Sequence, residues 1–143
     1  MTPMADKRPL WERMDTQPRR SMAELKAADI PESPGVYALY RDGARMYVGK
    51  ADCLRHRVWR NHSGRGAVMT GSAMRRNVAE HLKVATSADI KARRYQPTAE
   101  EVAAVRSWLD GCDIAWLESE TTVAAQRLED DLKNEYKPPL TKR

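Results

Sequence analysis

Short apolar runs separated by turn residues outline the first elements of the fold. Residues 35–40 are rich in aromatic and aliphatic side chains, and the run ends at Asp42-Gly43, a pair typical of tight hairpin turns. Residues 46–49 provide the returning strand, and residues 113–117 form another short run that is typical of a buried strand. The pattern therefore predicts three strands, two of them joined as a hairpin.

Helical spacing and capping residues predict the remaining elements. Ser21 and Glu24 have the spacing of a capping box, which predicts a short helix that Pro31 and Pro34 end. The other expected helices are a single turn around Leu10, Trp11 and Met14, a helix from Asp52 to residues 63–66, one from Ser72 to Leu82, one from a second capping box at Thr98 to Trp108, and one from Thr121 or Thr122 to Tyr136.

This order of elements predicts an α+β domain. We expect a small three-stranded, mainly antiparallel sheet flanked by helices, with an extra basic helical insert. Residues 1–20 are expected to be a partly ordered N-terminal lead. Residues 21–143 then form a single domain, with the insert at residues 61–113.

The composition excludes several classes of protein. The chain has 143 residues, of which 41% are hydrophobic and 31% charged, a balance typical of one globular domain. No apolar run is long enough for a membrane span, and the first 20 residues lack the core of a secretory signal. Two cysteines are too few for a disulfide framework or a zinc site of cysteines alone. We therefore expect a cytoplasmic protein.

Basic residues are concentrated in the middle of the chain. Residues 41–96 contain 13 Lys and Arg against 4 Asp and Glu, whereas residues 97–143 contain 6 against 10. This asymmetry favours a polyanionic partner for the middle segment and a cation site in the last one. A solvated basic face without a ligand is the alternative that charge alone leaves open.

Four motifs occur in an order that is informative as a set. Gly35-Val36-Tyr37 and Tyr47-Val48-Gly49 lie on the two strands of the predicted hairpin, and Arg57 follows on the next helix. Glu129 lies on the last helix, within the segment 128–138. Together these residues resemble the paired motif, arginine and closing helix of the GIY-YIG endonuclease family, with valine in both isoleucine positions. The resemblance covers roughly residues 35–60 and 114–140.

The resemblance implies a metal-dependent endonuclease that hydrolyses DNA phosphodiester bonds. Glu129 would hold one divalent ion, Mg²⁺ or Mn²⁺, and Arg57 would bind the non-bridging phosphate oxygens. Tyr47 or Tyr37 would act as the general base. Because a free phenol has a pKa near ~10, a neighbouring cation must lower that pKa, and Lys50 and the metal are the candidates.

The acidic run 129–131 leaves the choice of metal ligand to helical spacing. Asp130 and Asp131 compete with Glu129, since such a run is otherwise a solvated acidic face. Glu129 is preferred because it shares helical spacing with Ala125 and Leu132, near the inward edge of the helix.

Two positions depart from the family pattern. Relatives often carry His or Tyr four residues after the arginine, where this chain has Asn61, with His62 one position later. Either His62 or Asn61 fills that place. Leu140-Thr141 stands where relatives often carry an asparagine. Trp59 is expected in the core, although its position beside Arg60 would also suit base stacking.

Five arginines are expected to bind the DNA backbone: Arg55, Arg60, Arg65, Arg75 and Arg76. The oligomeric state stays open between monomer and homodimer. A nucleic-acid-binding module with a decayed or regulatory site is the alternative function, and the residue at position 61 is its main support. A protein-interaction domain that binds no nucleic acid is a third hypothesis, which the basic middle segment disfavours.

Overall fold

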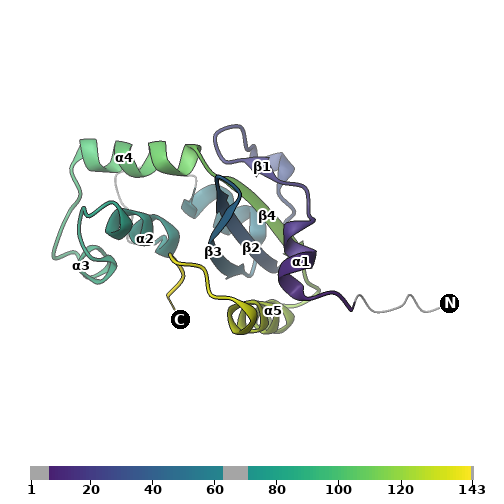
Figure 1. Cartoon of the computed structure of the whole chain (residues 1–143). Coiled ribbons are helices and arrows are strands. Elements are labelled where there is room, and N and C mark those ends of the chain that lie inside the picture. The colour runs from purple at the N-terminus through teal and green to yellow at the C-terminus, as the bar shows by residue number, and fades with distance from the viewer. Residues whose placement is uncertain (1–6, 63–70, 143) are drawn as a thin grey trace.

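A four-stranded antiparallel sheet organises the chain (Figure 1). Its central strand β2 (Gly35–Arg41) lies between β3 (Ala44–Ala51) and β4 (Asp113–Glu118), and the short strand β1 (Arg20–Ser21) pairs with the far side of β4. The computed structural model describes residues 7–62 and 71–142, without the side chains of residues 60–62. The α+β class and the flanking helices are therefore confirmed, and the sheet has one strand more than expected.

The hairpin forms as the sequence predicted. Asp42 and Gly43 both have positive φ, 52° and 80°, as the tight turns that match the twist of a hairpin require. Strand pairing then runs in register from Arg41↔Ala44 to Gly35↔Ala51, apart from one irregularity beside Tyr40.

The capping box at Ser21 does not start a helix. Ser21 instead pairs with Asp113, and the Met22 amide donates a hydrogen bond to the Cys112 carbonyl oxygen at 2.9 Å. Met22 and Leu25 are then buried, 3% and 5% exposed. Burial of these two side chains against the sheet outweighs a local capping preference, which typically contributes only about 1 kcal/mol.

The helices otherwise follow the expected order: α1 (Leu10–Asp15), the 3₁₀ turn η1 (Ala27–Asp29), the π-helix η2 (His56–His62), α2 (Ala73–His81), α3 (Ser87–Lys91), α4 (Ala99–Asp110) and α5 (Thr122–Glu135). The caps expected at Ser72, Thr98 and Thr121 all accept a first-turn amide hydrogen bond, so these three helix starts are confirmed. The sequence did not predict α3. Tyr136, the expected last residue of the final helix, is its C-cap and is 46% exposed.

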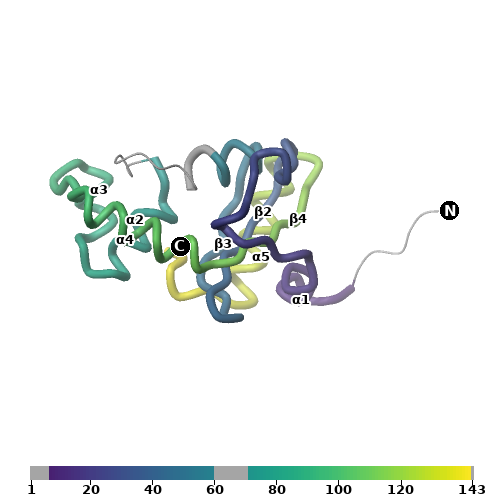
Figure 2. Tube along the Cα trace, turned by 90° about the horizontal axis from the view of Figure 1, so that it is seen from above, coloured from purple at the N-terminus to yellow at the C-terminus, as the bar shows by residue number. Residues whose placement is uncertain are grey.

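Two hydrophobic clusters cover opposite faces of the sheet, because successive strand residues point to opposite sides. Val36, Ala38 and Val48 pack with residues of α1 and α5. Tyr37 and Tyr47 belong to the other cluster, which includes side chains of α2, α3 and α4. Figures 1 and 2 show these three helices grouped on the β3 side of the sheet.

The C-terminal segment closes the exposed edge of β3. The Leu140 amide donates to the Met46 carbonyl oxygen at 2.9 Å, and the Val48 amide donates to Thr141 Oγ1 at 2.9 Å. Asn77 Nδ2 on α2 donates to the Leu140 carbonyl oxygen at 2.9 Å. Thr141, which departs from the family pattern, therefore satisfies a buried amide of the edge strand. Among the described residues, no helix is long and apolar enough to cross a bilayer.

Candidate active site

Tyr37 and Tyr47 lie diagonally across the hairpin on the same face of the sheet. Tyr37 pairs with Gly49 and Tyr47 pairs with Leu39, so the two rings are neighbours with centroids 6.1 Å apart. A Cβ atom at Gly49 would lie 2.5 Å from the Tyr37 hydroxyl oxygen. Gly49 therefore lets the Tyr37 ring cross the neighbouring strand and reach Tyr47.

A hydrogen bond between the two phenols distinguishes their roles. Burial raises the pKa of Tyr37 well above its usual value, and the hydrogen bond to Tyr47 raises it further. Burial also raises the pKa of Tyr47, but the hydrogen bond with Tyr37 acts to lower it. The hydrogen bond thus disfavours ionisation of Tyr37 and favours ionisation of Tyr47. Tyr47 is thus the phenol whose anion the pair stabilises.

Arg57 and Glu129 act on this pair with opposite charges. Arg57 is half-buried on η2, and its charge lowers the pKa of both tyrosines. Glu129 on α5 is 9% exposed, and its charge raises both pKa values. The structure therefore brings together a phenol pair, a guanidinium and a carboxylate from β2, β3, η2 and α5.

The comparisons with known proteins identify the family of this domain. The profile of the GIY-YIG catalytic domain matches residues 20–143. The chain belongs to the GIY-YIG family. It carries an endonuclease domain of that family.

Part of the chain is similar in sequence to a curated protein. UvrABC system protein C of Maricaulis maris (strain MCS10) is 42% identical over 65 residues, covering 38% of this chain and 10% of that protein. The chain thus matches about a tenth of the length of this relative. No solved structure gives a significant match.

The carboxylate of Glu129 differs from its acidic neighbours in burial. Asp130 and Asp131 are exposed, whereas Glu129 is buried. Glu129 Oε1 accepts hydrogen bonds from Lys133 Nζ at 3.2 Å and Gln126 Nε2 at 3.4 Å. Among the described contacts, Oε1 accepts both of these hydrogen bonds. The other carboxylate oxygen, Oε2, is therefore the atom that can bind a further ligand.

The donor set at Glu129 fits a hard divalent cation held by one carboxylate. The described residues contain no group of three His, Cys, Asp or Glu side chains that would enclose a metal ion. Mg²⁺ commonly keeps most of its water ligands and binds through one or two carboxylates and substrate phosphates. A single buried carboxylate beside a phenol pair is compatible with that mode.

Lys50 lies away from this group. Strand alternation directs Lys50, which pairs with Val36, to the face of the sheet opposite Tyr47 and Gly49. The cations whose charge lowers the pKa of Tyr47 are Arg57 and Arg76. Burial nevertheless keeps that pKa above its usual value, so these two charges do not offset desolvation.

The arginines expected to bind the DNA backbone occupy different environments. Arg55 Nη1 pairs with Glu32 at 2.8 Å and its Nε donates to the Ile30 carbonyl oxygen at 2.9 Å. Arg75 and Arg76 are buried, 5% and 9% exposed. They lie on α2 where it is enclosed by the other helices, so neither has the solvent-exposed position expected of a backbone-binding side chain.

Three of the predicted residues, Arg60, His62 and Arg65, have side chains outside the described set. The backbone of His56–His62 is nevertheless described, and it is a π-helix. A π-helix pairs residue i with residue i+5, where an α-helix pairs i with i+4. In this register His62, five positions after Arg57, takes the place that i+4 has in an α-helix.

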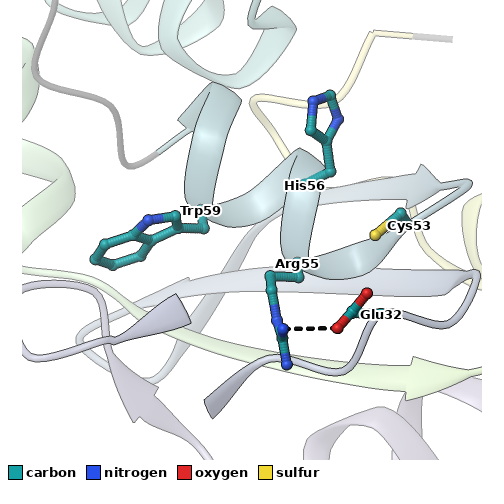
Figure 3. Close-up of a pocket in the computed structure, with 5 residues that line it drawn as sticks. All are labelled: Glu32, Cys53, Arg55, His56 and Trp59. Atoms are coloured by element: carbon teal, nitrogen blue, oxygen red, sulfur yellow. Dashed lines mark hydrogen bonds and ion pairs between the residues drawn. The ribbon is translucent and has the colours of Figure 1, made fainter. Parts of the chain in front are cut away.

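A pocket of about 420 Å³ lies on the outer side of the same helical segment (Figure 3). Trp59, expected in the core, is 41% exposed and lines this pocket with Cys53 and His56. Figure 3 shows the Trp59 and His56 side chains projecting in different directions, with Arg55 turned toward Glu32.

Sequence reasoning missed the position of Arg76 and the steric role of Gly49. Arg75 and Arg76 were expected on an exposed, DNA-binding side of the helix from Ser72 to Leu82, because charged residues are seldom fully buried. The apolar stripe of Met74 and Val78 was visible, but not that α2 is enclosed on several sides.

Proposed function

We propose that this GIY-YIG domain hydrolyses DNA phosphodiester bonds with a divalent metal ion, Mg²⁺ or Mn²⁺, at Glu129. The observation that carries the proposal is the pair of neighbouring phenols, Tyr37 and Tyr47, with ring centroids 6.1 Å apart and within the fields of Arg57 and Glu129. This arrangement combines a base, a cation for the phosphate and a ligand for the metal at one point on the sheet.

Tyr47 is the proposed general base. The water oxygen attacks phosphorus, the water proton passes to the ionised Tyr47 Oη and restores the neutral phenol, and the bond from phosphorus to the leaving oxygen breaks. Tyr37 stabilises the Tyr47 anion by donating its hydrogen bond, and Arg57 stabilises it by charge. The leaving oxygen takes its proton from solvent.

Arg57 is the proposed ligand of the non-bridging phosphate oxygens. A planar guanidinium binds two oxygen atoms at once and keeps its charge at every working pH. The bound metal would supply further neutralisation of the developing charge and would cancel the unfavourable effect of Glu129 on Tyr47.

His62 is the proposed occupant of the position that relatives fill with His or Tyr. The π-helical register of His56–His62 supports His62 over Asn61. This reading weakens the alternative of a decayed site, since that alternative depended on Asn61.

DNA is the proposed substrate because the basic middle segment suits a polyanion. Arg60 and Arg65 remain the proposed backbone contacts in this segment. Arg55 is engaged within the fold and buried Arg75 lies near the charge of Arg106, so the proposal for backbone binding no longer extends to these two.

Cleavage of labelled single-stranded, duplex and branched DNA tests the proposal. Reactions contain EDTA, Mg²⁺ or Mn²⁺, and the variants are Glu129→Gln, Tyr47→Phe and, as a matched control on the same helix, Asp131→Asn. We expect cutting that needs metal, that is lost in the first two variants and that persists in the control. Salt-sensitive DNA binding without cutting under either metal would favour the binding module instead.

A further inference from the structure

Helix α2 contributes a buried arginine to the site. Arg76 is 9% exposed, and its helix neighbours Met74 and Val78 are fully buried in the cluster that contains Tyr37 and Tyr47. The helix therefore packs on the tyrosine face of the sheet. Arg76 comes from the basic insert, for which the sequence provided no catalytic motif.

Contacts among the described residues place its guanidinium. Arg76 Nε donates a hydrogen bond to Ser87 Oγ, in the first turn of α3, at 3.3 Å. The charge also interacts with Tyr47 and with Arg57. Arg76 is thus oriented by α3 and lies within electrostatic range of the phenol acceptor and of the arginine on η2.

Arg57 and Arg76 bring two like charges to one phenol. Burial and the charge of Arg57 lower the pKa of Arg76, yet a guanidinium does not release its proton at working pH. Each of the two cations therefore disfavours the other. The carboxylate of the site, Glu129, is engaged by Lys133 at 3.2 Å. A phosphate bound by both guanidinium groups would relieve this repulsion.

We propose that Arg76 is a second phosphate-binding arginine of the site and shares the non-bridging oxygens of the reacting phosphodiester with Arg57. The planar guanidinium groups of Arg57 on η2 and Arg76 on α2 can each bind a different phosphate oxygen atom. The inference rests on the proposed function, because it takes the phosphate beside Tyr47 as the reacting group.

The preceding residue provides a contrast within the same helix. Arg75 is 5% exposed, but the charge that acts on it is that of Arg106 on α4. Successive residues on a helix are about 100° apart, so the two arginines have different neighbours. Arg106, whose side chain is 19% exposed and pairs with Asp110 at 3.2 Å, supplies a control for the loss of a largely buried guanidinium.

Calorimetric titration with inorganic phosphate, at low salt and without divalent metal, tests the anion site independently of catalysis. We expect wild type to bind one phosphate. Arg57→Gln and Arg76→Gln should each weaken that affinity by about tenfold or more, and Arg106→Gln should leave it unchanged. Phosphate binding by Arg76→Gln equal to that of wild type, or no binding by wild type, would overturn the proposal.

Single-turnover cleavage provides the second readout. Arg76→Gln should slow cleavage by about 100-fold while the Kd for DNA changes little. Arg76→Lys, which retains the charge and most of the volume, should recover only part of the phosphate affinity and rate. Full recovery of phosphate affinity and cleavage rate in Arg76→Lys would overturn the role of the planar guanidinium group. If Arg76→Gln does not fold, by circular dichroism, the lysine variant alone decides.

The two proposals can fail separately. A wild-type chain that binds phosphate through both arginines but cuts no DNA would contradict the proposed hydrolysis and support the anion site. Metal-dependent cutting with a rate that Arg76→Gln does not alter would support hydrolysis and overturn the role of Arg76.

Discussion

The hairpin carries two groups built from the same residue types, one on each face of the sheet. On one face, Tyr47 lies within the fields of Arg57 and Glu129. On the other, Tyr40 and Arg45 contact Asp15 of α1. Each group combines a phenol, a guanidinium and a carboxylate, but they are assembled differently.

The polar groups around Asp15 are paired with one another, and we call them the closed group. Tyr40 donates a hydrogen bond to Asp15 Oδ1 at 2.7 Å, and Arg45 Nε donates to both carboxylate oxygens at 3.2 Å. The Arg45 guanidinium also lies over the Trp11 ring, 4.7 Å from its centroid. These contacts satisfy the charges within the group and fasten α1 to the hairpin.

The group around Tyr47 is open. Within the described residues, no ion pair joins Arg57 to Glu129, and Glu129 is engaged by Lys133 of its own helix. Charges that do not neutralise one another remain available for a phosphate and a metal ion. The same residue types therefore stabilise the fold where they pair, and in the proposed mechanism they serve chemistry where they do not.

Removing a charge from the open group should have the largest effect on activity. Arg57→Gln is expected to reduce cleavage by about 10²–10³-fold, because it removes the cation that stabilises the developing negative charge. Single-turnover rates measure the loss, and thermal unfolding should show a Tm close to that of wild type. A large drop in Tm would mean that Arg57 is structural, like Arg45.

Filling the space that Gly49 leaves beside the two tyrosines should have the next largest effect on activity. Gly49→Ala introduces a Cβ that would lie 2.5 Å from the Tyr37 hydroxyl oxygen and 3.0 Å from a Tyr47 ring carbon. We expect displacement of the phenol pair, with about 1–3 kcal/mol lost from the free energy of unfolding and cleavage reduced by at least about tenfold. Denaturant unfolding and cleavage rates check both. Unchanged activity would show that the Tyr37–Tyr47 contact is dispensable.

The pH dependence of the cleavage rate should follow the ionisation of Tyr47. Because burial raises the pKa of Tyr47, the rate should increase with pH through the alkaline range as the phenol ionises. Arg76→Gln should move this rise to higher pH, since the Arg76 charge lowers the pKa of Tyr47. A pH–rate profile of wild type, Arg76→Gln and Tyr47→Phe measures it. The same profile in all three would contradict the assignment of Tyr47 as base.

Breaking the closed group should change stability and leave the chemistry intact. Asp15→Asn is expected to lower the free energy of unfolding at pH 7 by about 1 kcal/mol, because the ion pair with Arg45 is half-exposed. Cleavage should persist. The measurement is denaturant unfolding, with the exposed pair Asp89–Arg94 as reference, where Asp89→Asn should have no measurable effect.

The free energy of unfolding at acidic pH provides a further test of the Asp15 group. Burial raises the pKa of Asp15, but hydrogen bonds from Arg45 and Tyr40 outweigh it, and the pKa lies below the ordinary value of 3.8. A carboxyl with a lowered folded-state pKa stabilises the fold above the ordinary pKa, and this contribution is lost as pH falls through the folded value. Wild type should therefore lose its advantage over Asp15→Asn below about pH 4, as measured by unfolding at several pH values.

Much of the site follows from motifs whose structural cause is local. Tyr37, Tyr47, Arg57 and Glu129 were all identified from the sequence, and the structure brings these four together. Two strands joined by a tight turn must place such tyrosines side by side once the register is known. Lys50 was not part of the group, because strand alternation alone directs it to the other face.

Short-range chemistry determined the hairpin and the helix starts. Asp42-Gly43 accommodates the positive φ values of the turn, and Ser72, Thr98 and Thr121 each satisfy an amide within three residues along the chain. These preferences involve neighbours in the sequence, so the sequence by itself contains them.

Tertiary packing decided the rest, because it depends on segments far apart in the chain. Ser21 became a strand residue since β4 offered a partner and the core received Met22. Arg76 became buried because α2 packs on the tyrosine face of the sheet, in the cluster that contains Tyr37 and Tyr47. Local propensity carries no information about such packing, and only the assembled fold brings a helix of the basic insert to the two tyrosines.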